Sequence, residues 1–235
     1  MQGHDLPDEV VVLGGHLDSV NWQQPGGNEE LAPGADDDAS GIATPTEIMR
    51  IALAGGWRPQ RTVKVVGYAA WEVGLRGSEA IASAYADAGT NVVGVLQLDM
   101  TNYRNGASYD LRIVSDNSNT ALLQYLRGLF DAYLAPRGLT RADVACGYGC
   151  SDHASWTEHG FPAGMLFETG HPYTPGGWDM GDFPYIHSAN DTLANMGDTV
   201  APSVPFVQLG LALLGELAKT HVRTDGTLFA DGFDP

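Results

Sequence analysis

Short runs of β-branched residues alternate along this chain with helical stretches of ten or more residues. We predict strands at residues 9–13, 62–70, 91–98, 111–115 and 162–167, and helices at 40–54, 77–88, 120–133 and 204–219. The alternation is typical of βαβ units, because parallel strands need a long crossover, usually a helix, to connect them. The sequence therefore predicts an α/β fold, a three-layer sandwich with a central, mainly parallel sheet covered by helices on both faces.

The length and composition are those of one folded domain. The chain has 235 residues, of which 43% are hydrophobic and 17% are charged. A single hydrophobic core can still grow to this size before chains usually divide. The polar, Gly/Asp-rich end predicts a flexible tail over residues 220–235, which leaves residues 1–219 as the domain.

The charge of the chain excludes two classes of partner. Asp and Glu number 29 against 12 Lys and Arg, which gives a formal net charge of −17. Neither a nucleic acid nor an anionic membrane is attracted to such a surface. No run approaches eighteen consecutive apolar residues, and the opening residues MQGHDLPDE lack the basic and apolar regions of a signal peptide. We expect no nucleic-acid and no membrane partner.

Acidic residues and histidines follow the predicted strands. His16, Glu72 and Asp99 come after the first three strands, Asp37 lies before the first helix, and His187 precedes the last helix. The carboxyl ends of parallel strands meet at one edge of a sheet, where ligands bind. Each residue alone is more often solvated surface or a hydrogen-bonded bystander. Together, two imidazoles and three carboxylates without a thiolate favour a site for zinc, cobalt or manganese.

Three adjacent acids and a cysteine pair add to this hypothesis. Asp36, Asp37 and Asp38 repel one another unless a divalent cation relieves the repulsion, and one of their carboxylates could bridge two ions. Cys146 and Cys150 are four residues apart, a spacing that allows a metal pair, two free thiols or a small disulfide loop.

An ordered set of motifs carries a resemblance to a known family. The motifs are GGHLDS (14–19), APGADDDASG (32–41), AAWEVGLRGSE (69–79), LQLDMTNY (96–103), CGYGCSDHASW (146–156) and YIHSANDTLANM (185–196). Over about residues 9–217 the chain resembles the catalytic domain of the bacterial secreted leucyl aminopeptidases, which are dizinc exopeptidases. The resemblance implies an enzyme that releases leucine-like, apolar residues from peptides with a free N-terminus by means of a metal-activated water. We expect the protein to be a monomer.

The resemblance assigns the metal ligands. Asp37 would bridge two Zn²⁺ ions, with Co²⁺ or Mn²⁺ as possible substitutes. Glu72 and His187 would complete one site, while His16 and Asp99 would complete the other.

The resemblance also implies roles for the neighbours of these ligands. The carboxylate of Asp18 would orient the His16 imidazole. Asp38 would support the bridging carboxylate through a cis peptide bond between Asp37 and Asp38.

Further residues are implied at the substrate side. Cys146 and Cys150 would form a disulfide, which points to a secreted protein in an oxidising compartment. Tyr148 would lie near the metals and donate a hydrogen bond to a developing oxyanion. Met100, Phe167 and Tyr148 would form the pocket for a leucine-like side chain, although ordinary core is the simpler interpretation of Met100 and Phe167.

The chain departs from the family at the general base. The family has two adjacent glutamates, of which the first is the base and the second a zinc ligand, whereas this chain has Trp71 and Glu72. A general base typically supplies about 10²–10⁴-fold in rate, so we expect weakened hydrolysis. A metal already lowers the pKa of its bound water to about 7, which leaves some activity. Glu168 is another carboxylate that we consider for the role.

A second departure is at the N-terminus, where the family has a helical segment and at least one strand before GGHLDS. We expect part of the sheet or its cover to be exposed. Two alternative functions remain: a zinc-dependent binder of peptide N-termini without turnover, and an acyl-transfer relative of the glutaminyl cyclase type. The latter works with one zinc and keeps its acidic base, so a zinc count separates it from the others.

Overall fold

A computed structural model describes residues 1–23, 31–104, 109–168 and 183–219. The predicted tail at 220–235 lies outside these residues. Within them, one sheet has the spatial order β2-β1-β3-β6-β4-β5. The strands are β1 (Leu6–His16), β2 (Arg61–Tyr68), β3 (Asn91–Leu98), β4 (Leu111–Val114), β5 (Arg141–Val144) and β6 (Ala163–Phe167). All neighbouring strands are parallel except β4 and β6, which are antiparallel, so the predicted mainly parallel sheet is confirmed.

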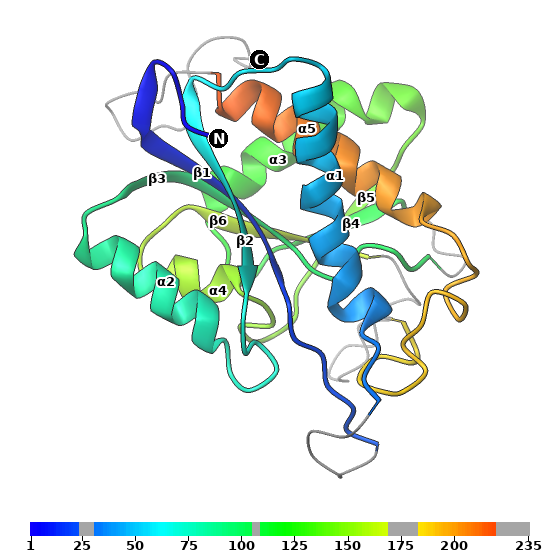
Figure 1. Ribbon diagram of the computed structural model, residues 1–235. Helices are drawn as coiled ribbons and strands as arrows, with labels where there is room; N and C mark the ends of the chain where they lie inside the picture. Colours follow the sequence, from blue (N-terminus) through cyan, green and yellow to red (C-terminus); the bar gives the residue numbers. More distant parts are fainter. Residues whose placement is uncertain (24–30, 105–108, 169–182, 220–235) are drawn as a thin grey trace.

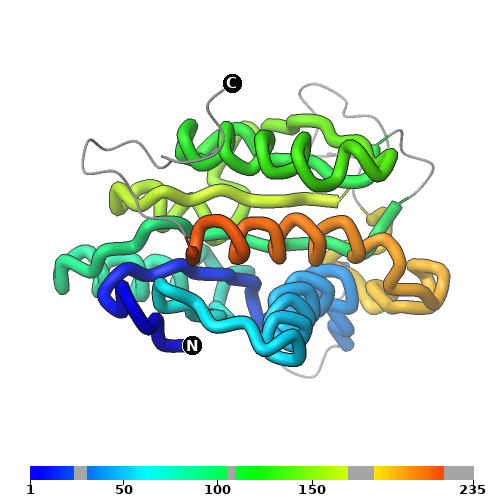
Figure 2. Tube along the Cα trace, turned by 90° about the horizontal axis from the view of Figure 1, so that it is seen from above, coloured from blue at the N-terminus to red at the C-terminus, as the bar shows by residue number. Residues whose placement is uncertain are grey.

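Helices cover both faces of this sheet, as predicted. The helices are α1 (Gly41–Ala54), α2 (Arg76–Asp87), α3 (Thr120–Tyr133), α4 (His153–Glu158) and α5 (Val204–Leu217). Figures 1 and 2 show α1, α5 and α3 side by side over one face, while α2 and α4 lie on the other. None of the described helices is long and apolar enough to cross a membrane.

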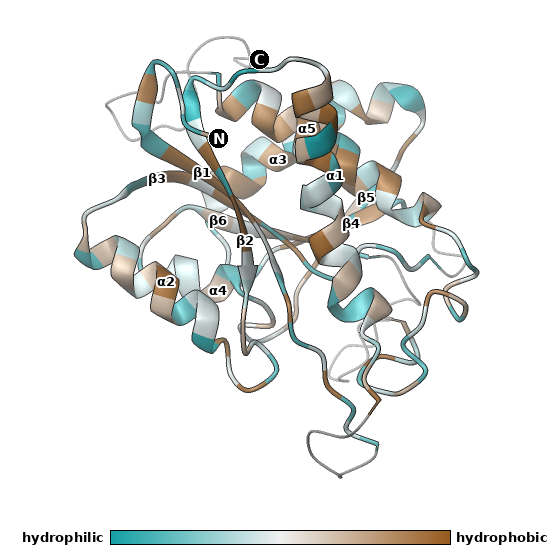
Figure 3. Cartoon of the chain, viewed as in Figure 1, coloured by the Kyte–Doolittle hydropathy of each residue, from teal (hydrophilic) through white to brown (hydrophobic). Residues whose placement is uncertain are grey.

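The central strand β1 is buried on both faces because each face has its own helix layer. Val11 and Leu13 belong to the apolar cluster under α1, α3 and α5. Val10 and Val12 belong to the cluster on the α2 and α4 side, where Trp156 is fully buried. Figure 3 shows the hydrophobic colour concentrated along these central strands. A strand buried on both faces reads as a continuous apolar run, which is how β1 was predicted.

The edge strand β2 is partly covered by the first residues of the chain. Val63 donates its backbone N–H to Met1 O at 2.8 Å, and Gly3 donates to Thr62 Oγ1 at 3.0 Å. Farther along β2, Val65 is 44% exposed. The expected exposure at this side of the sheet is therefore confined to the later part of β2.

Candidate metal centre

The predicted metal ligands meet at the carboxyl edge of the sheet. His16 is the last residue of β1, Asp99 directly follows β3, and Glu72 lies in the turn after β2. Asp37 lies in a kinked segment (Ala35–Ser40) that leads into α1, and its own backbone is not helical. His187 comes from the loop before α5. Residues separated by as much as 171 positions, from 16 to 187, are thus brought to one place by the parallel topology.

These ligands form two groups that share Asp37. In the first, His16 Nε2 lies 2.9 Å from Asp37 Oδ1 and 3.8 Å from Asp99 Oδ1. In the second, His187 Nε2 lies 3.0 Å from Asp37 Oδ2 and 3.5 Å from Glu72 Oε2. Within each group the ligand atoms lie within 4.8 Å of one another. Each oxygen of one carboxylate therefore faces a different group.

The atoms that converge here lack ordinary partners. His16 Nε2, His187 Nε2 and both carboxylate oxygens of Asp37 and Glu72 are buried without a hydrogen-bond partner among the described residues. Buried polar atoms are normally hydrogen-bonded, so this set is an exception that calls for an explanation. Imidazole nitrogens and carboxylate oxygens are zinc ligands. The residues present fit two metal ions with Asp37 between them.

The crowding of charges shifts the pKa values of the ligands. Burial opposes protonation of His16, but the carboxylates of Asp37 and Asp99 outweigh it and raise the His16 pKa to about 11. Burial raises the pKa of Glu72 to about 9 and that of Asp99 to about 6. Burial also opposes ionisation of Asp37, yet its contacts with His16 and His187 lower its pKa. Without a cation, His16 and Glu72 therefore keep a proton at neutral pH, which metal binding would release.

Asp18 holds the His16 ring through its main chain. His16 Nδ1 lies 2.9 Å from Asp18 O, while the nearer carboxylate oxygen is 3.8 Å from that nitrogen. The carboxylate instead accepts the backbone N–H groups of Trp71 and Glu72, each at 3.0 Å. The turn after β2 would otherwise leave these N–H groups unpaired, and pairing them is why the carboxylate points away from the imidazole. Asp18 therefore supports a ligand from each group.

Asp38 fastens the start of α1 to the sheet. Its carboxylate is buried and accepts backbone N–H bonds from His16 at 2.8 Å, Gly41 at 2.9 Å and Met100 at 3.1 Å. The Asp37–Asp38 peptide bond is cis, as the resemblance implies. Asp38 thus links both strand ends that carry ligands to the turn that carries Asp37.

Asp191 supports the shared ligand from the far end of the chain, a role that sequence reasoning missed. Its carboxylate accepts the backbone N–H groups of Asp36 at 2.8 Å and Asp37 at 3.1 Å. Asp191 lies four residues after His187, within the motif YIHSANDTLANM, which was the available signal.

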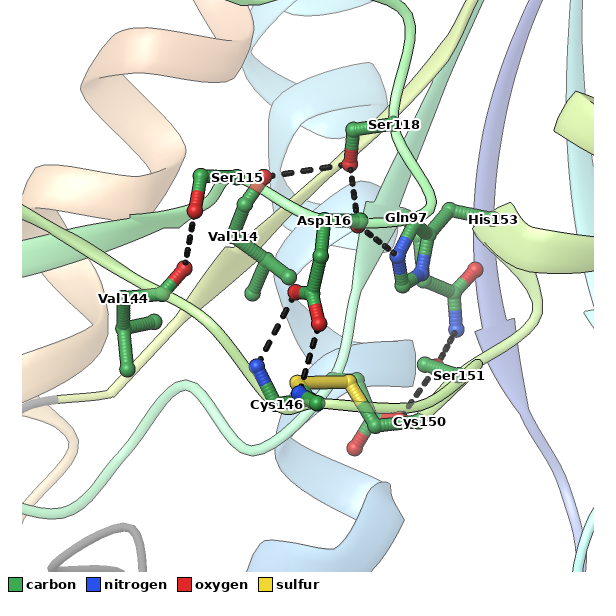
Figure 4. Close-up of a disulfide and its surroundings, with 12 residues drawn as sticks. Gln97, Val114, Ser115, Asp116, Ser118, Val144, Cys146, Cys150, Ser151 and His153 are labelled. Carbon is green, nitrogen blue, oxygen red and sulfur yellow. Dashed lines mark hydrogen bonds between the residues drawn. A yellow bond between two sulfur atoms is a disulfide. The ribbon is translucent and has the colours of Figure 1, made fainter. Parts of the chain in front are cut away.

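Ser151 is a second missed residue, and it supports Asp99. Its hydroxyl donates to Asp99 Oδ2 at 2.5 Å, and Gln97 Nε2 donates to the same hydroxyl at 3.1 Å. Figure 4 shows Ser151 directly beside Cys150. The segment that contains the cysteine pair therefore also fixes a metal ligand.

Cys146 and Cys150 are joined in a disulfide, one of the three arrangements that their spacing allowed (Figure 4). The carboxylate of Asp116 accepts the backbone N–H groups of Cys146 at 2.9 Å and Gly147 at 2.6 Å. Tyr148, inside the loop, is 50% exposed. Its hydrogen bond to a substrate oxygen stays a prediction.

The other two predicted pocket residues are buried. Met100 and Phe167 are each 3% exposed and belong to one apolar cluster with Cys150, Phe183 and Met196. This cluster adjoins the disulfide loop. Contact of Met100 or Phe167 with a substrate side chain stays a prediction.

Glu168, the other carboxylate considered as a base, is held by main-chain hydrogen bonds. The side chain is fully buried, and its carboxylate accepts the backbone N–H groups of Phe183 at 2.8 Å and Tyr103 at 2.9 Å. Its role is to connect three segments of the chain.

Trp71, where the resemblance implies a general base, stacks on the predicted ligand His16. Its ring lies 4.7 Å from the His16 ring, centroid to centroid, at an interplanar angle of 10°. Trp22 packs against His187 with the centroids 3.8 Å apart and the rings tilted by 42°.

Comparison with known proteins shows the family of this chain. Residues 1–209 match peptidase family M28. A probable aminopeptidase of Saccharomyces cerevisiae is 36% identical over 222 residues, which are 92% of this chain and 55% of that protein. Leucine aminopeptidase 1 of Arthroderma otae is 37% identical over 220 residues, 90% of this chain and 55% of that protein. The chain thus spans about half the length of the curated relatives it matches.

Solved structures show the same fold. The LapA aminopeptidase of Legionella pneumophila has a TM-score of 0.75 and 31% identity, covering 91% of this chain and 52% of that one. A zinc aminopeptidase from Bacillus subtilis has a TM-score of 0.72 at 19% identity, covering 93% of this chain and 49% of that one, and its likeness concerns the fold alone. The family match extends over most of the chain and includes each ligand described above. The chain belongs to peptidase family M28.

Proposed function

We propose that this chain is the catalytic part of a dizinc aminopeptidase that releases leucine-like residues from peptides with a free N-terminus. The observation that carries the proposal is the pair of ligand groups sharing Asp37, whose buried atoms lack hydrogen-bond partners among the described residues. Support comes from relatives named leucine aminopeptidase and from the zinc aminopeptidase that shares the fold.

The residues around the centre would have different roles in peptide hydrolysis. Bound zinc would supply Lewis-acid polarisation of the scissile carbonyl and an activated water. Asp37 would hold the two ligand groups at a fixed separation, because each of its oxygens faces one group. Tyr148, half exposed in the disulfide loop, would donate a hydrogen bond to the developing oxyanion.

Trp71 makes the expected turnover slow. An indole cannot accept a proton from water, and the Glu168 carboxylate is held by backbone N–H groups. The test is hydrolysis of leucine p-nitroanilide by the zinc-loaded protein and by Trp71→Glu. We expect the variant to be faster by about 10²–10⁴-fold.

A matched control introduces a carboxylate near residue 71 but not at the position of the proposed general base. Val73 is exposed and lies two residues from Trp71, so Val73→Glu should leave the rate unchanged. Equal rates for the protein and Trp71→Glu would show that the base is not limiting. No hydrolysis by either protein, with two zinc ions bound, would overturn the proposed activity.

A second candidate function is favoured by Trp71 itself. A centre that keeps its ligands but lacks a base suits a zinc-dependent binder of peptide N-termini. Calorimetric binding of a leucyl peptide without measurable turnover, even by Trp71→Glu, would support it. The acyl-transfer alternative predicts one zinc per chain, whereas the shared Asp37 favours two.

The disulfide supports a location outside the reducing cytosol. Disulfides persist in oxidising compartments, so we propose that the protein is secreted. We also propose that it acts as a monomer, which the molar mass in solution would test.

A further inference from the structure

Each of the two imidazole ligands lies against an indole ring. Trp71 is nearly parallel to His16, with the ring centroids 4.7 Å apart and an interplanar angle of 10°. Trp22 is closer to His187, at 3.8 Å, and more tilted, at 42°. The Trp71 ring also lies 6.5 Å from the His187 ring at an angle of 30°, but its closer and nearly parallel contact is with His16. His16 and His187 belong to different ligand groups.

Main-chain hydrogen bonds fix the backbone at both tryptophans, although Trp22 itself is 65% exposed. Trp22 donates its backbone N–H to His187 O at 3.0 Å. Trp71 donates its backbone N–H to the Asp18 carboxylate, and Asp18 O contacts the His16 ring. Each indole is therefore tied to its imidazole through the backbone as well as through ring contact. A change of side chain at residue 22 or 71 leaves these hydrogen bonds in place.

The imidazole rings need this support to different degrees. His16 has a hydrogen bond from Nδ1 to Asp18 O, which fixes one edge of the ring but leaves the tilt about that bond free. The His187 Nε2 atom is buried without a hydrogen-bond partner among the described residues, and the contacts of this ring are with Trp22 at 3.8 Å and, farther away, with Trp71 at 6.5 Å. In both cases an aromatic face next to the imidazole would restrict its plane.

Trp71 is held by packing and not by its polar atom. Its Nε1 is buried without a hydrogen-bond partner among the described residues. The indole is therefore free of any polar anchor that would explain its place beside His16, and the stacked ring is the contact left to account for it.

We propose that Trp71 and Trp22 are positioning residues for the metal ligands. Each indole fixes the plane of one imidazole so that its Nε2 points toward the shared carboxylate of Asp37. The inference rests on the proposed zinc centre and gives Trp71 a role in metal binding in place of the lost acid–base role. Groups that orient a ligand histidine contribute to metal affinity without touching the metal.

The test measures zinc affinity in ring-removing and ring-keeping variants. Trp71→Leu and Trp22→Leu remove one stacked ring each, and Trp71→Phe and Trp22→Phe keep one. A stacked aromatic pair contributes enough to change an equilibrium by about 2- to 10-fold. Competition with a chelator should show zinc affinity lower by about that factor in the Leu variants and largely restored in the Phe variants. Trp57→Phe, beyond the far end of α1, is the control and should bind zinc as the unaltered protein does.

A second readout reports the ring contact directly. In the metal-free protein, the His16 ring protons lie over the Trp71 indole, so their NMR signals should be displaced upfield by its ring current. Trp71→Leu should abolish the displacement and Trp71→Phe should reduce it, while thermal unfolding shows whether each variant is folded.

The outcomes separate this inference from the proposed function. Folded Leu variants that bind zinc as tightly as the unaltered protein would overturn the positioning role and leave the proposed aminopeptidase intact. An unaltered protein that binds no zinc would overturn the proposed function, and with it the inference. Weaker binding in both the Leu and the Phe variants of one residue would overturn ring stacking as the cause.

Discussion

The two ligand groups that share Asp37 differ in how the fold supports them. In what we call the buried group, His16 and Asp99 come from the ends of β1 and β3, and their side chains are at most 4% exposed. In the outer group, Glu72 and His187 come from loops, and the His187 side chain is 14% exposed. His187 also has a positive φ of 55°, an unusual conformation for a residue with a side chain.

The difference extends to the residues behind the ligands. Asp99 accepts a hydrogen bond from Ser151, and His16 contacts Asp18 O. Among the described residues, His187 has ring contact with Trp22 but no hydrogen bond through Nδ1. Ligands that are held by hydrogen bonds bind metal more tightly than ligands that are less restrained. The buried group should therefore bind its ion more tightly and fill first.

The largest effect is expected from a change in the ligand that both groups share. Asp37→Asn keeps the shape of the shared ligand but removes the negative charge from both groups. We expect zinc content to fall from two ions per chain to less than one, with loss of hydrolysis. Elemental analysis after dialysis measures this, and Asp8→Asn, a change at the surface of β1, is the control. Two retained ions would contradict the shared-ligand geometry.

The next prediction compares the groups directly. His187→Ala should lose the outer ion and keep the buried one, so that about one zinc remains per chain. His16→Ala should lower the affinity for zinc more, because it removes a ligand from the tighter group. Titration with zinc against a competing chelator gives the affinity for each remaining ion. The comparison would be reversed if His187→Ala proved to be the more damaging change.

A smaller effect is expected on the stability of the fold at acid pH, and it comes from His153, which lies near Ser151. His153 begins α4, two residues after Ser151, and its ring is completely buried. Burial lowers the His153 pKa from 6.5 to about 4. Above pH 6.5 the ring is neutral in both the folded and the unfolded chain and costs nothing. As the pH falls toward 4 the unfolded chain takes up a proton first, so folding loses up to about 3 kcal/mol.

The His153→Gln variant isolates this contribution. Urea unfolding of the metal-free proteins between pH 7 and pH 4 should show the free energy of unfolding falling more steeply for the unaltered chain than for the variant. If the free energies of unfolding of the two proteins change in parallel with pH, His153 has the same pKa in the folded and the unfolded chain, which would contradict the prediction.

The bounds of a strand or helix could be predicted where its apolar residues form a clear pattern. The strand at 91–98 and the helix at 120–133 were predicted at their observed bounds, since both have long, uniform apolar patterns. β5 and α4 were missed because Arg141–Val144 and His153–Glu158 are too short for a periodicity to be visible. β4 is as short as β5 but was predicted, because Leu111–Val114 is mostly apolar whereas Arg141–Val144 is half charged. Composition therefore decided the outcome among the short strands.

Three of the five candidate ligands could be predicted because they follow strand ends, and the other two because they lie in loops before helices, but the contacts that support them could not be predicted. Nothing in the local sequence shows that Asp191 pairs with the backbone of Asp37, or that Ser151 pairs with Asp99. These contacts join distant segments and depend on the packing of the whole sheet. The same dependence explains Asp18. Its carboxylate was predicted to hold the His16 ring, but its main-chain oxygen does so, while the carboxylate accepts a backbone N–H from Trp71.

The contact between Asp191 and the backbone of Asp37 also sets the time at which the centre can form during synthesis. Asp191 and His187 follow Asp37 by about 150 residues, which at typical rates of elongation is roughly 8–30 s of synthesis. Until then the nascent chain has the shared carboxylate without the loop that orients it. The candidate centre can therefore form only after the segment around residue 191 has been translated, well after the carboxylate that its two ligand groups share.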